Sequence, residues 1–573
     1  MSILKKISMR TIIITAVVSA LVVALLICLL VIDELPRYKY IVTVPDTGST
    51  LQVILEITNP AFGKTKILSL LQGDKDMDVF MPYDSAGRPN KDTVFDAGVL
   101  YFKIDRGSKT YLTYDAAVAK SGKHGNRGGV SSNYTVFDGE QALLLPINCY
   151  TYKPGSDRNI LMREISFVFD LPDGWEQLTP RAPVENPRWA DIYAITQDAF
   201  VFGKFNKIPN TAAGLDAFTL SDANSVSEET IDGFNRLYAY YEALFGSAPS
   251  RYSIVALPKP GGGAPQIIGG AGRGSVAASF DPDLMRDWQL LSHRMFHAFF
   301  DSVAPYASFH MPGNLWFFEG LATYYENMAM EALPDTLKTR LDIDVNRQMT
   351  LLFNNYLYMR IKDPRAFGFP PMHEEELTLD AQVEFLHYTA APLIVKLLED
   401  RARQKSGQRD AALRYCVNNS DSFDERFVSF EAALELLGEK EGQKFSEDYV
   451  VSIETPPLWN LKKYQPSDER IRAGLNEIEQ VLGSWFRQVN EKYPIDIVSR
   501  ERLQEAVESL NDRRVLFLSV ETSLLLEDYC LPLYALLNDY YYTAKQKGIE
   551  FTDIELRTKM FADEDESGES DSE

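Results

Sequence analysis

Between residues 37 and 188, short apolar runs alternate with turn residues. Tyr40–Val44 and Leu51–Thr58 are rich in β-branched side chains, and the sequence PDTG between them is typical of a turn. Further apolar runs of strand length follow at 99–104, 142–147 and 165–172. This pattern predicts an antiparallel β-sandwich.

From residue 189 onward, strand-like runs give way to helical spacing. Residues 199–205 and 252–257 predict strands, whereas Ser227, followed by two glutamates, is a typical helix start. Asp281-Pro282 predicts the start of another helix, because aspartate caps a helix and proline suits its first turn. The apolar stripe of that helix recurs every three or four residues, at Leu284, Trp288, Leu291, Met295 and Phe299.

The N-terminal apolar run is long enough for a membrane helix. Thr11–Ile32 contains 22 residues without a charge, and a helix of that length rises about 33 Å, enough to cross the hydrocarbon core of a bilayer. Lys5, Lys6 and Arg10 precede the run. They predict a single-pass anchor in the cell membrane, with the N-terminus in the cytoplasm and the bulk of the chain outside. A long cleaved signal peptide is the alternative.

The composition is that of a folded, acidic protein. The 573 residues are 45% hydrophobic, and Lys and Arg total 58 against 81 Asp and Glu. About three or four domains are expected from the length. The net charge of −23 argues against a nucleic-acid partner, because neutralising phosphates requires clustered Lys and Arg. The acidic tail ADEDESGESDSE is predicted to be disordered.

Two of the six histidines lie one helical turn apart. His293 and His297 fall on the side of the predicted helix away from its apolar stripe, where both imidazoles can reach one metal ion at about 2.0–2.1 Å. Glu319 follows His297 by 22 residues, in LWFFEGLATYYE. A carboxylate from a following helix is the usual third ligand of a zinc site with two histidines. Glu326, two turns further on, is placed to hydrogen-bond one of these ligands.

These segments resemble those of a known enzyme family. LLSHRMFH followed by LWFFEGLATYYE looks like the gluzincin, or thermolysin-like, zinc metallopeptidases, and most closely their glycyl aminopeptidase branch. Residues 191–205 resemble that family's entry into its catalytic domain, and residues 385–407 resemble the helix that carries its catalytic tyrosine. The resemblance covers roughly residues 40–450.

The resemblance assigns roles to four residues and bounds to the domains. It implies that His293, His297 and Glu319 are zinc ligands, and that Tyr388 stabilises a tetrahedral intermediate. With the patterns above, it predicts an α+β multidomain protein. Its expected parts are a cytoplasmic N-terminus at 1–10, a transmembrane helix at 11–32, a β-sandwich domain at 37–188, a thermolysin-like α+β domain at 189–400, a C-terminal α-helical domain at 401–546 and a terminal segment at 547–573.

Three departures from the family pattern indicate a catalytically degenerate member. Arg294 stands where the family has its catalytic glutamate, and arginine has no acceptor site for a proton. The family's substrate-binding Gly-Gly-Leu-Glu-His segment corresponds to Gly269–Ser275, which contains no carboxylate. Ala390-Ala391 replaces the Lys-Gly that usually follows the tyrosine.

The sequence thus leaves the presence of activity open. One hypothesis is a membrane-tethered, non-catalytic binding or scaffolding protein that takes a peptide or protein ligand in the old active-site cleft. Another is an active zinc (amino)peptidase that uses a different base, either Glu326 or a substrate carboxylate. In a third, the ligand residues are remnants in an ordinary packed cleft. The positive charge of Arg294 predicts weak or partial Zn²⁺ occupancy.

Overall fold

The computed structural model of the protein describes residues 34–456, apart from gaps at 46–48, 62–63, 73–76, 119–120, 123–124, 127, 150–160, 180–183, 224, 260–266, 269–273, 305–312, 363–366, 378, 419–429 and 453–455. The predicted anchor Thr11–Ile32 and the acidic tail lie outside the described residues. Within the described residues, no helix is long and apolar enough to span a membrane.

The chain divides into two compact units. One comprises residues 1–227 and 249–281, and the other comprises residues 228–248 and 282–573. The first contains the strands described here and the second contains most of the helices. The fold is therefore a mixed α+β fold of more than one unit, while the domain boundaries expected from the sequence stay a prediction.

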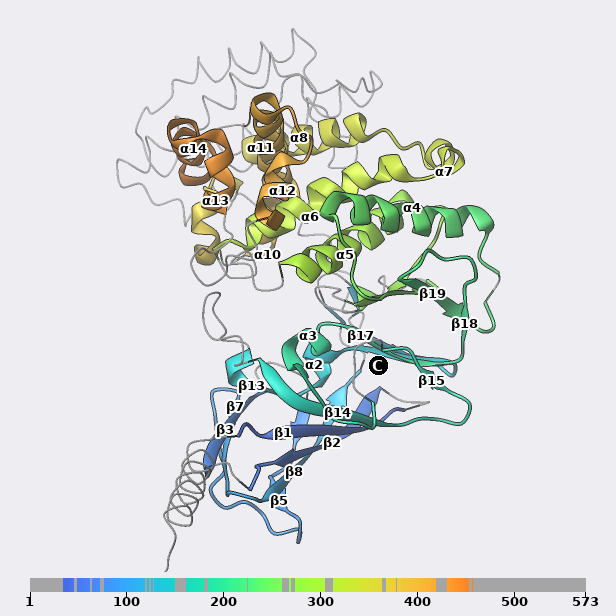
Figure 1. Cartoon of the computed structure of the whole chain (residues 1–573), viewed down its shortest axis with the longest axis vertical. Helices are drawn as coiled ribbons and strands as arrows, with labels where there is room; N and C mark the ends of the chain where they lie inside the picture. Colours follow the sequence, from blue (N-terminus) through green and yellow to red (C-terminus); the bar gives the residue numbers. More distant parts are fainter. Residues whose placement is uncertain are drawn as a thin grey trace, which may run out of the picture. The chain divides into compact units, whose positions relative to one another are not determined.

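The largest sheet of the first unit has seven strands. Its strands pair in the order β16-β14-β1-β2-β8-β4, and β5 also pairs with β8. Figure 1 shows β1, β2, β8 and β14 next to one another. The bounds are β1 Arg37–Thr43, β2 Thr50–Thr58, β4 Met77–Val79, β5 Tyr83–Asp84, β8 Lys109–Ala117, β14 Met162–Asp170 and β16 Arg188–Asp191.

Three smaller sheets complete the β-rich part. They pair as β13-β3-β7-β6, β11-β12-β17-β15 and β10-β9. The bounds are β3 Lys66–Leu71, β6 Val94–Asp96, β7 Val99–Ile104, β9 Ser121–Gly122, β10 Gly125–Asn126, β11 Gly128–Val130, β12 Tyr134–Asp138, β13 Leu145–Pro146, β15 Glu176–Gln177 and β17 Ala199–Gly203.

Two expectations for this region are wrong in detail. The large sheet is not purely antiparallel, because β1 pairs with β14 in parallel. The long stretch of chain between these strands permits that pairing, which a short hairpin could not make. The strand expected at 142–147 is also shorter. Asp138 caps helix α2, Gly139–Ala142, by accepting a hydrogen bond from the backbone of Glu140, so that only Leu145–Pro146 remains as a strand.

A five-stranded sheet in the order β18-β19-β20-β22-β21 belongs to the same unit. Ten buried residues, from Tyr134 of β12 to Ala277 of β22, form one hydrophobic cluster that links this sheet with β12 and β17. The bounds are β18 Phe205–Lys207, β19 Leu215–Leu220, β20 Tyr252–Leu257, β21 Ile267–Ile268 and β22 Ser275–Ser279, with the short helix α3 at Ile192–Thr196.

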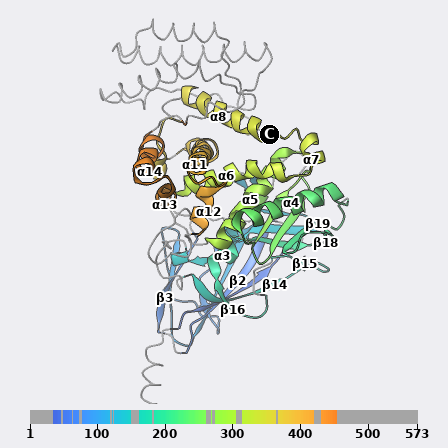
Figure 2. The same cartoon turned by 45° about the horizontal axis from the view of Figure 1, so that its top comes forward.

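Helices form the second unit. Helices α4, α5 and α6 lie side by side in both views (Figures 1 and 2). The bounds are α4 Glu228–Phe245, α5 Met285–Val303, α6 Leu315–Ala329, η4 Met330–Ala332, α7 Asp335–Arg340, α8 Val345–Lys362, η5 Pro371–Glu376, α10 Asp380–Phe385, η6 Leu386–Ala390, α11 Ala391–Ser406, α12 Ala411–Asn418, α13 Phe430–Leu434, η8 Glu435–Leu437, α14 Glu439–Ser446 and η9 Glu447–Val451.

Helix α5 starts later than its sequence indicates. Its cap residue is Leu284, not Asp281, and its first residue is Met285, because the indole nitrogen of Trp288 donates a hydrogen bond to the carbonyl of Pro282 and holds that residue in a turn. Leu284 is therefore exposed, whereas the other four members of the predicted apolar stripe are buried. From Trp288 onward, the residues of the predicted stripe therefore belong to the hydrophobic core.

Close backbone contacts fix the helices around α5 and α6. Gly233 of α4 lies so near the ring of Trp288 that a Cβ there would be 2.5 Å from it. Gly320 of α6 meets α11 in the same way, because a Cβ at this position would be 2.6 Å from the Cβ of Ala391. No other side chain fits at either glycine without displacing its neighbour.

The helical rod from α10 to α11 contains one wide turn. Its backbone stays helical from Asp380 to Ser406, but η6 is a π-helical turn in which the Ala391 backbone N–H donates to the carbonyl of Leu386. Pro392 explains the turn: in an α-helix its ring would clash with the carbonyl of Tyr388, four residues earlier. Such turns are frequent at functional sites.

Candidate metal centre

Helix α5 places the two predicted ligand histidines against each other. The ring centroids of His293 and His297 are 4.6 Å apart, and the two residues are only 7% and 2% exposed. Their Nε2 atoms are 3.0 Å apart. Two imidazole nitrogens come this close if one donates a proton to the other or if both bind the same cation.

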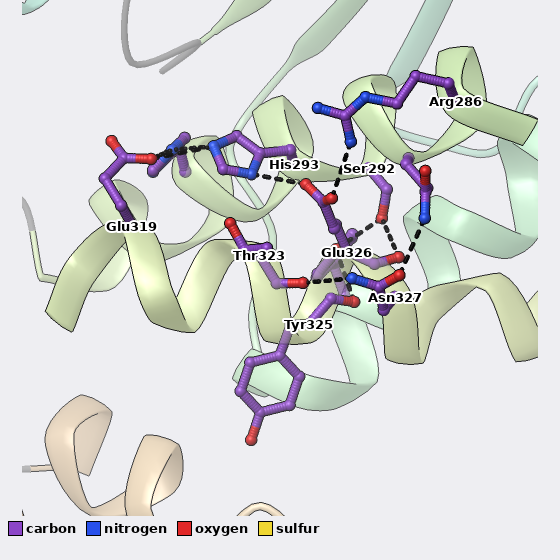
Figure 3. Close-up of polar contacts among 11 residues, drawn as sticks. Arg286, Ser292, His293, Glu319, Thr323, Tyr325, Glu326 and Asn327 are labelled. Atoms are coloured by element: carbon purple, nitrogen blue, oxygen red, sulfur yellow. Dashed lines mark hydrogen bonds and ion pairs between the residues drawn. The ribbon is translucent and has the colours of Figure 1, made fainter. Parts of the chain in front are cut away.

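Helix α6 brings Glu319 to the same point. Its Oε2 lies 3.2 Å from Nε2 of His293 and 3.6 Å from Nε2 of His297, and Figure 3 shows the carboxylate facing the imidazole of His293. Among the described residues, these three form the one group of side chains whose spacing could hold a metal ion. The structure thus brings together the three residues predicted as ligands.

The donor set fits zinc in both chemistry and spacing. Two imidazole nitrogens and a carboxylate oxygen are a common zinc ligand set. Ligand atoms about 2.0–2.1 Å from a tetrahedral ion lie roughly 3.3 Å from one another, and the observed separations of 3.0, 3.2 and 3.6 Å surround that value. When bound, such an ion supplies Lewis-acid chemistry and leaves a coordination position for a ligand.

Glu326 and Arg286 support His293 from the opposite side of its ring. Oε2 of Glu326 is 2.8 Å from Nδ1 of His293, and its Oε1 is 3.2 Å from Nη1 of Arg286. Figure 3 shows the resulting row of Glu319, His293, Glu326 and Arg286. Glu326 accepts the Nδ1 proton, which directs Nε2 of His293 toward the other ligands.

Sequence reasoning placed Glu326 behind a ligand but missed Arg286. The signal was present, because Arg286 precedes His293 by seven residues, two turns of the same helix face. Arg286 is 69% exposed at its side chain, whereas the side chain of Glu326 is 5% exposed. The pair therefore joins a surface cation to a buried carboxylate.

Further polar contacts fix α5 against α6. The amide of Gln289 donates to Oδ1 of Asn327 at 2.9 Å, and Asn327 in turn donates to the carbonyl of Thr323 at 2.8 Å. The hydroxyls of Ser292 and Tyr241 are 2.7 Å apart. All of these contacts are buried, and the one between Gln289 and Asn327 joins α5 to α6, where it helps to set the register in which the histidines meet Glu319.

The charges of the cluster act strongly on one another. Burial would raise the pKa of Glu319, but His297 and His293 outweigh it and hold that pKa well below its usual range. Burial disfavours the charged form of His293, yet hydrogen bonds to Glu319 and Glu326 raise its pKa. For His297 burial prevails and the pKa is lowered. One ring is thus disposed to carry the positive charge while the other stays neutral.

Arg294 and Tyr388 lie near the same cluster. The ring centroids of Tyr388 and His293 are 6.0 Å apart. Burial, followed by the charge of Glu319, raises the pKa of Tyr388, while Arg294 acts in the opposite direction. Arg294 also contributes, after burial, to the lowered pKa of His297. The charge of Arg294 therefore acts on His297 of its own helix and on Tyr388 of η6.

Neither the described part of segment 269–275 nor His387 belongs to the group of possible metal ligands. Of the segment 269–275, Gly274 and Ser275 are described, and the Gly274 N–H donates to Asp198 at 2.6 Å. His387, next to Tyr388 in sequence, is buried and pairs with the buried Glu374 at 2.5 Å. Nothing in the spacing of the sequence signals this pair, since the two residues come from different elements.

Comparisons with known proteins give a match at the level of fold. No family model and no curated protein matches the sequence. The structure is similar to an aminopeptidase N family protein from Idiomarina loihiensis, with a TM-score of 0.54 and 15% identity, over 75% of this chain and 80% of that one.

Two further solved structures resemble the chain more loosely. They are the M1 zinc metallopeptidase from Deinococcus radiodurans and a point variant of it, with TM-scores of 0.43 and 0.44 and 17% identity. They cover 72% of this chain and 91% and 92% of their own lengths. The chain therefore shares the fold of the Idiomarina aminopeptidase N family protein.

Proposed function

We propose that this chain is a non-catalytic relative of the glycyl aminopeptidases that uses a zinc site to bind a peptide or protein ligand. In this proposal His293, His297 and Glu319 hold the ion, with Glu326 orienting His293. The chain is anchored in the cell membrane by Thr11–Ile32, and its bulk lies outside the cytoplasm.

Position 294 carries the proposal. A zinc peptidase needs a carboxylate beside the metal-bound water to accept a proton and pass it to the leaving amine. Arg294 has no acceptor site for that proton. General acid–base assistance is typically worth about 10²–10⁴ in rate, so its loss leaves a site that binds far better than it turns over.

The position of Glu326 argues against it as a substitute base. Its carboxylate bonds to Nδ1 of His293, whereas Nε2 of the same ring faces Glu319 and His297. The imidazole thus stands between Glu326 and the place of a metal-bound water. Both of its oxygens already have partners, His293 and Arg286.

A hydrolysis assay tests the catalytic part of the proposal. Full-length protein in detergent, supplied with zinc, should release no amino acids from short peptides or aminoacyl anilides in a chelator-sensitive way. Arg294→Glu alone should restore little, because the segment Gly269–Ser275 still lacks a carboxylate for a substrate's amino group. Wild-type turnover that His293→Ala and chelator both abolish would establish an active peptidase instead.

A protease-accessibility assay tests the topology. In intact cells or spheroplasts, external protease should degrade the bulk of the chain, and a reporter enzyme fused after residue 573 should be active only outside the cytoplasm. A chain that survives intact while an exposed control protein is degraded has the opposite orientation or no anchor.

A further inference from the structure

The two histidines of the candidate metal centre differ in what supports them. Nδ1 of His293 lies 2.8 Å from Oε2 of Glu326 (Figure 3). Nδ1 of His297 is buried and, among the residues that the structure describes, has no hydrogen-bond partner. Asp301, one helical turn further along α5, does not bond it either. Because a metal-binding histidine almost always donates its other ring N–H to an acceptor, His297 departs from the usual arrangement.

Aromatic side chains surround His297 where an acceptor would be expected. The ring centroid of Phe318, the residue before Glu319, lies 4.5 Å from that of the imidazole. Phe296 adds a second ring at 6.1 Å. His297 is 2% exposed, so bulk water does not replace the missing partner. An aromatic face is at most a weak acceptor for an N–H group, and the imidazole therefore lacks a strong one.

Zinc binding places a proton of His297 where it has no partner. When Nε2 of a neutral imidazole holds an ion, the proton of the ring must be on Nδ1. In His293 that proton meets Glu326, whereas in His297 it is buried and unbonded, which is unfavourable. Without the ion, the proton of His297 can stay on Nε2, which is 3.0 Å from Nε2 of His293. Zinc therefore competes with the hydrogen bonding of His297 and is compatible with that of His293.

We propose that His297 is the labile ligand of this centre, and that the centre fills and empties as the zinc supply changes. This inference rests on the proposed function and adds the regulation of its site. His293, oriented by Glu326, and Glu319 form the firmer part of the site, from which His297 departs first. The zinc supply then regulates the proposed binding site.

Substituting each histidine in turn tests which one holds the ion. Zinc affinity is measured on the full-length protein in detergent, by competition against a chromophoric chelator. His293→Ala should weaken zinc binding roughly 10- to 100-fold more than His297→Ala, the factor that an orienting acceptor typically contributes. Equal losses, or a larger loss for His297→Ala, would overturn the inference.

A substitution at Phe318 tests the missing acceptor directly. Phe318→Asn places an amide oxygen beside His297, and it should slow the release of zinc into excess chelator by roughly 10- to 100-fold. Phe318→Leu is the matched control, because it also removes the ring but offers no acceptor, so its zinc should leave faster than that of the asparagine variant. Equal release rates from the two variants would contradict the inference. Thermal unfolding with chelator present shows whether both fold, and the histidine pair decides if they do not.

Hydrolysis, measured on the same samples, separates this inference from the proposed function. Equal losses for the two histidine variants refute the labile ligand and leave the non-catalytic zinc site standing. Chelator-sensitive hydrolysis together with the expected asymmetry refutes the non-catalytic function and keeps His297 as the labile ligand. A wild-type chain that binds no zinc in the competition refutes the zinc site and the inference together.

Discussion

Replacing Glu326 by glutamine removes one charge and changes little else in shape, so it measures what the buried carboxylate does for metal binding. In the wild type, one oxygen accepts from Nδ1 of His293 at 2.8 Å and the other from Arg286 at 3.2 Å. Glutamine has one acceptor oxygen and one donor NH₂ group. Because His293 and Arg286 both donate, either orientation of the amide places two donors against each other.

The size of the effect follows from the burial of the site. Glu326 is 4% exposed, so water cannot replace the lost acceptor. Losing a partner that orients a metal-bound histidine typically costs 10–100-fold in affinity, which corresponds to about 1.4–2.7 kcal/mol. Because the NH₂ group of the glutamine would face another donor, we expect the loss of zinc affinity to lie at the upper end of that range. Arg286→Gln should have a smaller effect, because the Arg286 side chain is 69% exposed and glutamine keeps an NH₂ group that can donate to the carboxylate.

Competition against a chromophoric chelator measures zinc affinity directly. Glu331→Gln is the control, because Glu331 is an exposed carboxylate just beyond the same helix. Thermal unfolding with chelator present checks that the variants are folded. If Glu326→Gln binds zinc within twofold of the wild type, Glu326 does not act through His293 and the account of the site is wrong.

Three further predictions concern the site and its scaffold. Gly320→Ala should lower the denaturation midpoint, by overpacking of about 1–3 kcal/mol, and adding Ala391→Gly should recover part of the loss because it removes the methyl group that the new Cβ meets; no recovery would contradict this contact. Burial raises the pKa of Glu399, so its contribution to stability is greatest below the unfolded-state pKa and falls as pH rises through the folded-state pKa. Thermal midpoints should therefore decline over that window relative to Glu399→Gln, and parallel curves would refute the assignment. Arg294→Ala should tighten zinc by roughly fivefold, about 1 kcal/mol of relieved repulsion, and Arg294→Glu by more; equal affinities in the same chelator competition would rule out the electrostatic effect.

The candidate site was more predictable than the fold that carries it. Helical spacing alone places His293 beside His297, because residues one turn apart share a face whatever the tertiary structure. The spacing does not say what Glu319 approaches, and that expectation came from the usual ligand set of zinc sites and from the resemblance. Packing supplies the rest, since the register of α6 against α5 depends on contacts such as Gln289 with Asn327.

The errors have a common physical origin in contacts between elements. Periodicity identifies β1 and β14 as strands but cannot show that they pair in parallel across more than one hundred intervening residues. The start of α5 was misplaced because an indole hydrogen bond to Pro282 competes with the capping signal of Asp281. Local propensity is a weak guide where a side chain offers the backbone another partner.

The wide turn before Pro392 changes the phase of the helix that carries Tyr388. A π turn holds one residue more than an α turn, so α10 and α11 are rotated relative to each other by about 100° compared with an uninterrupted helix. In an alignment, a relative without the proline would differ here by a single-residue gap inside a helix. Deleting one residue from Leu386–Ala390 would leave the helix length almost unchanged. It would rotate the side chain of Tyr388 to a different direction about the helix axis. The extra residue of the π turn thus determines the direction in which Tyr388 points. Inserting or deleting one codon here can change that direction without any change to the surrounding core.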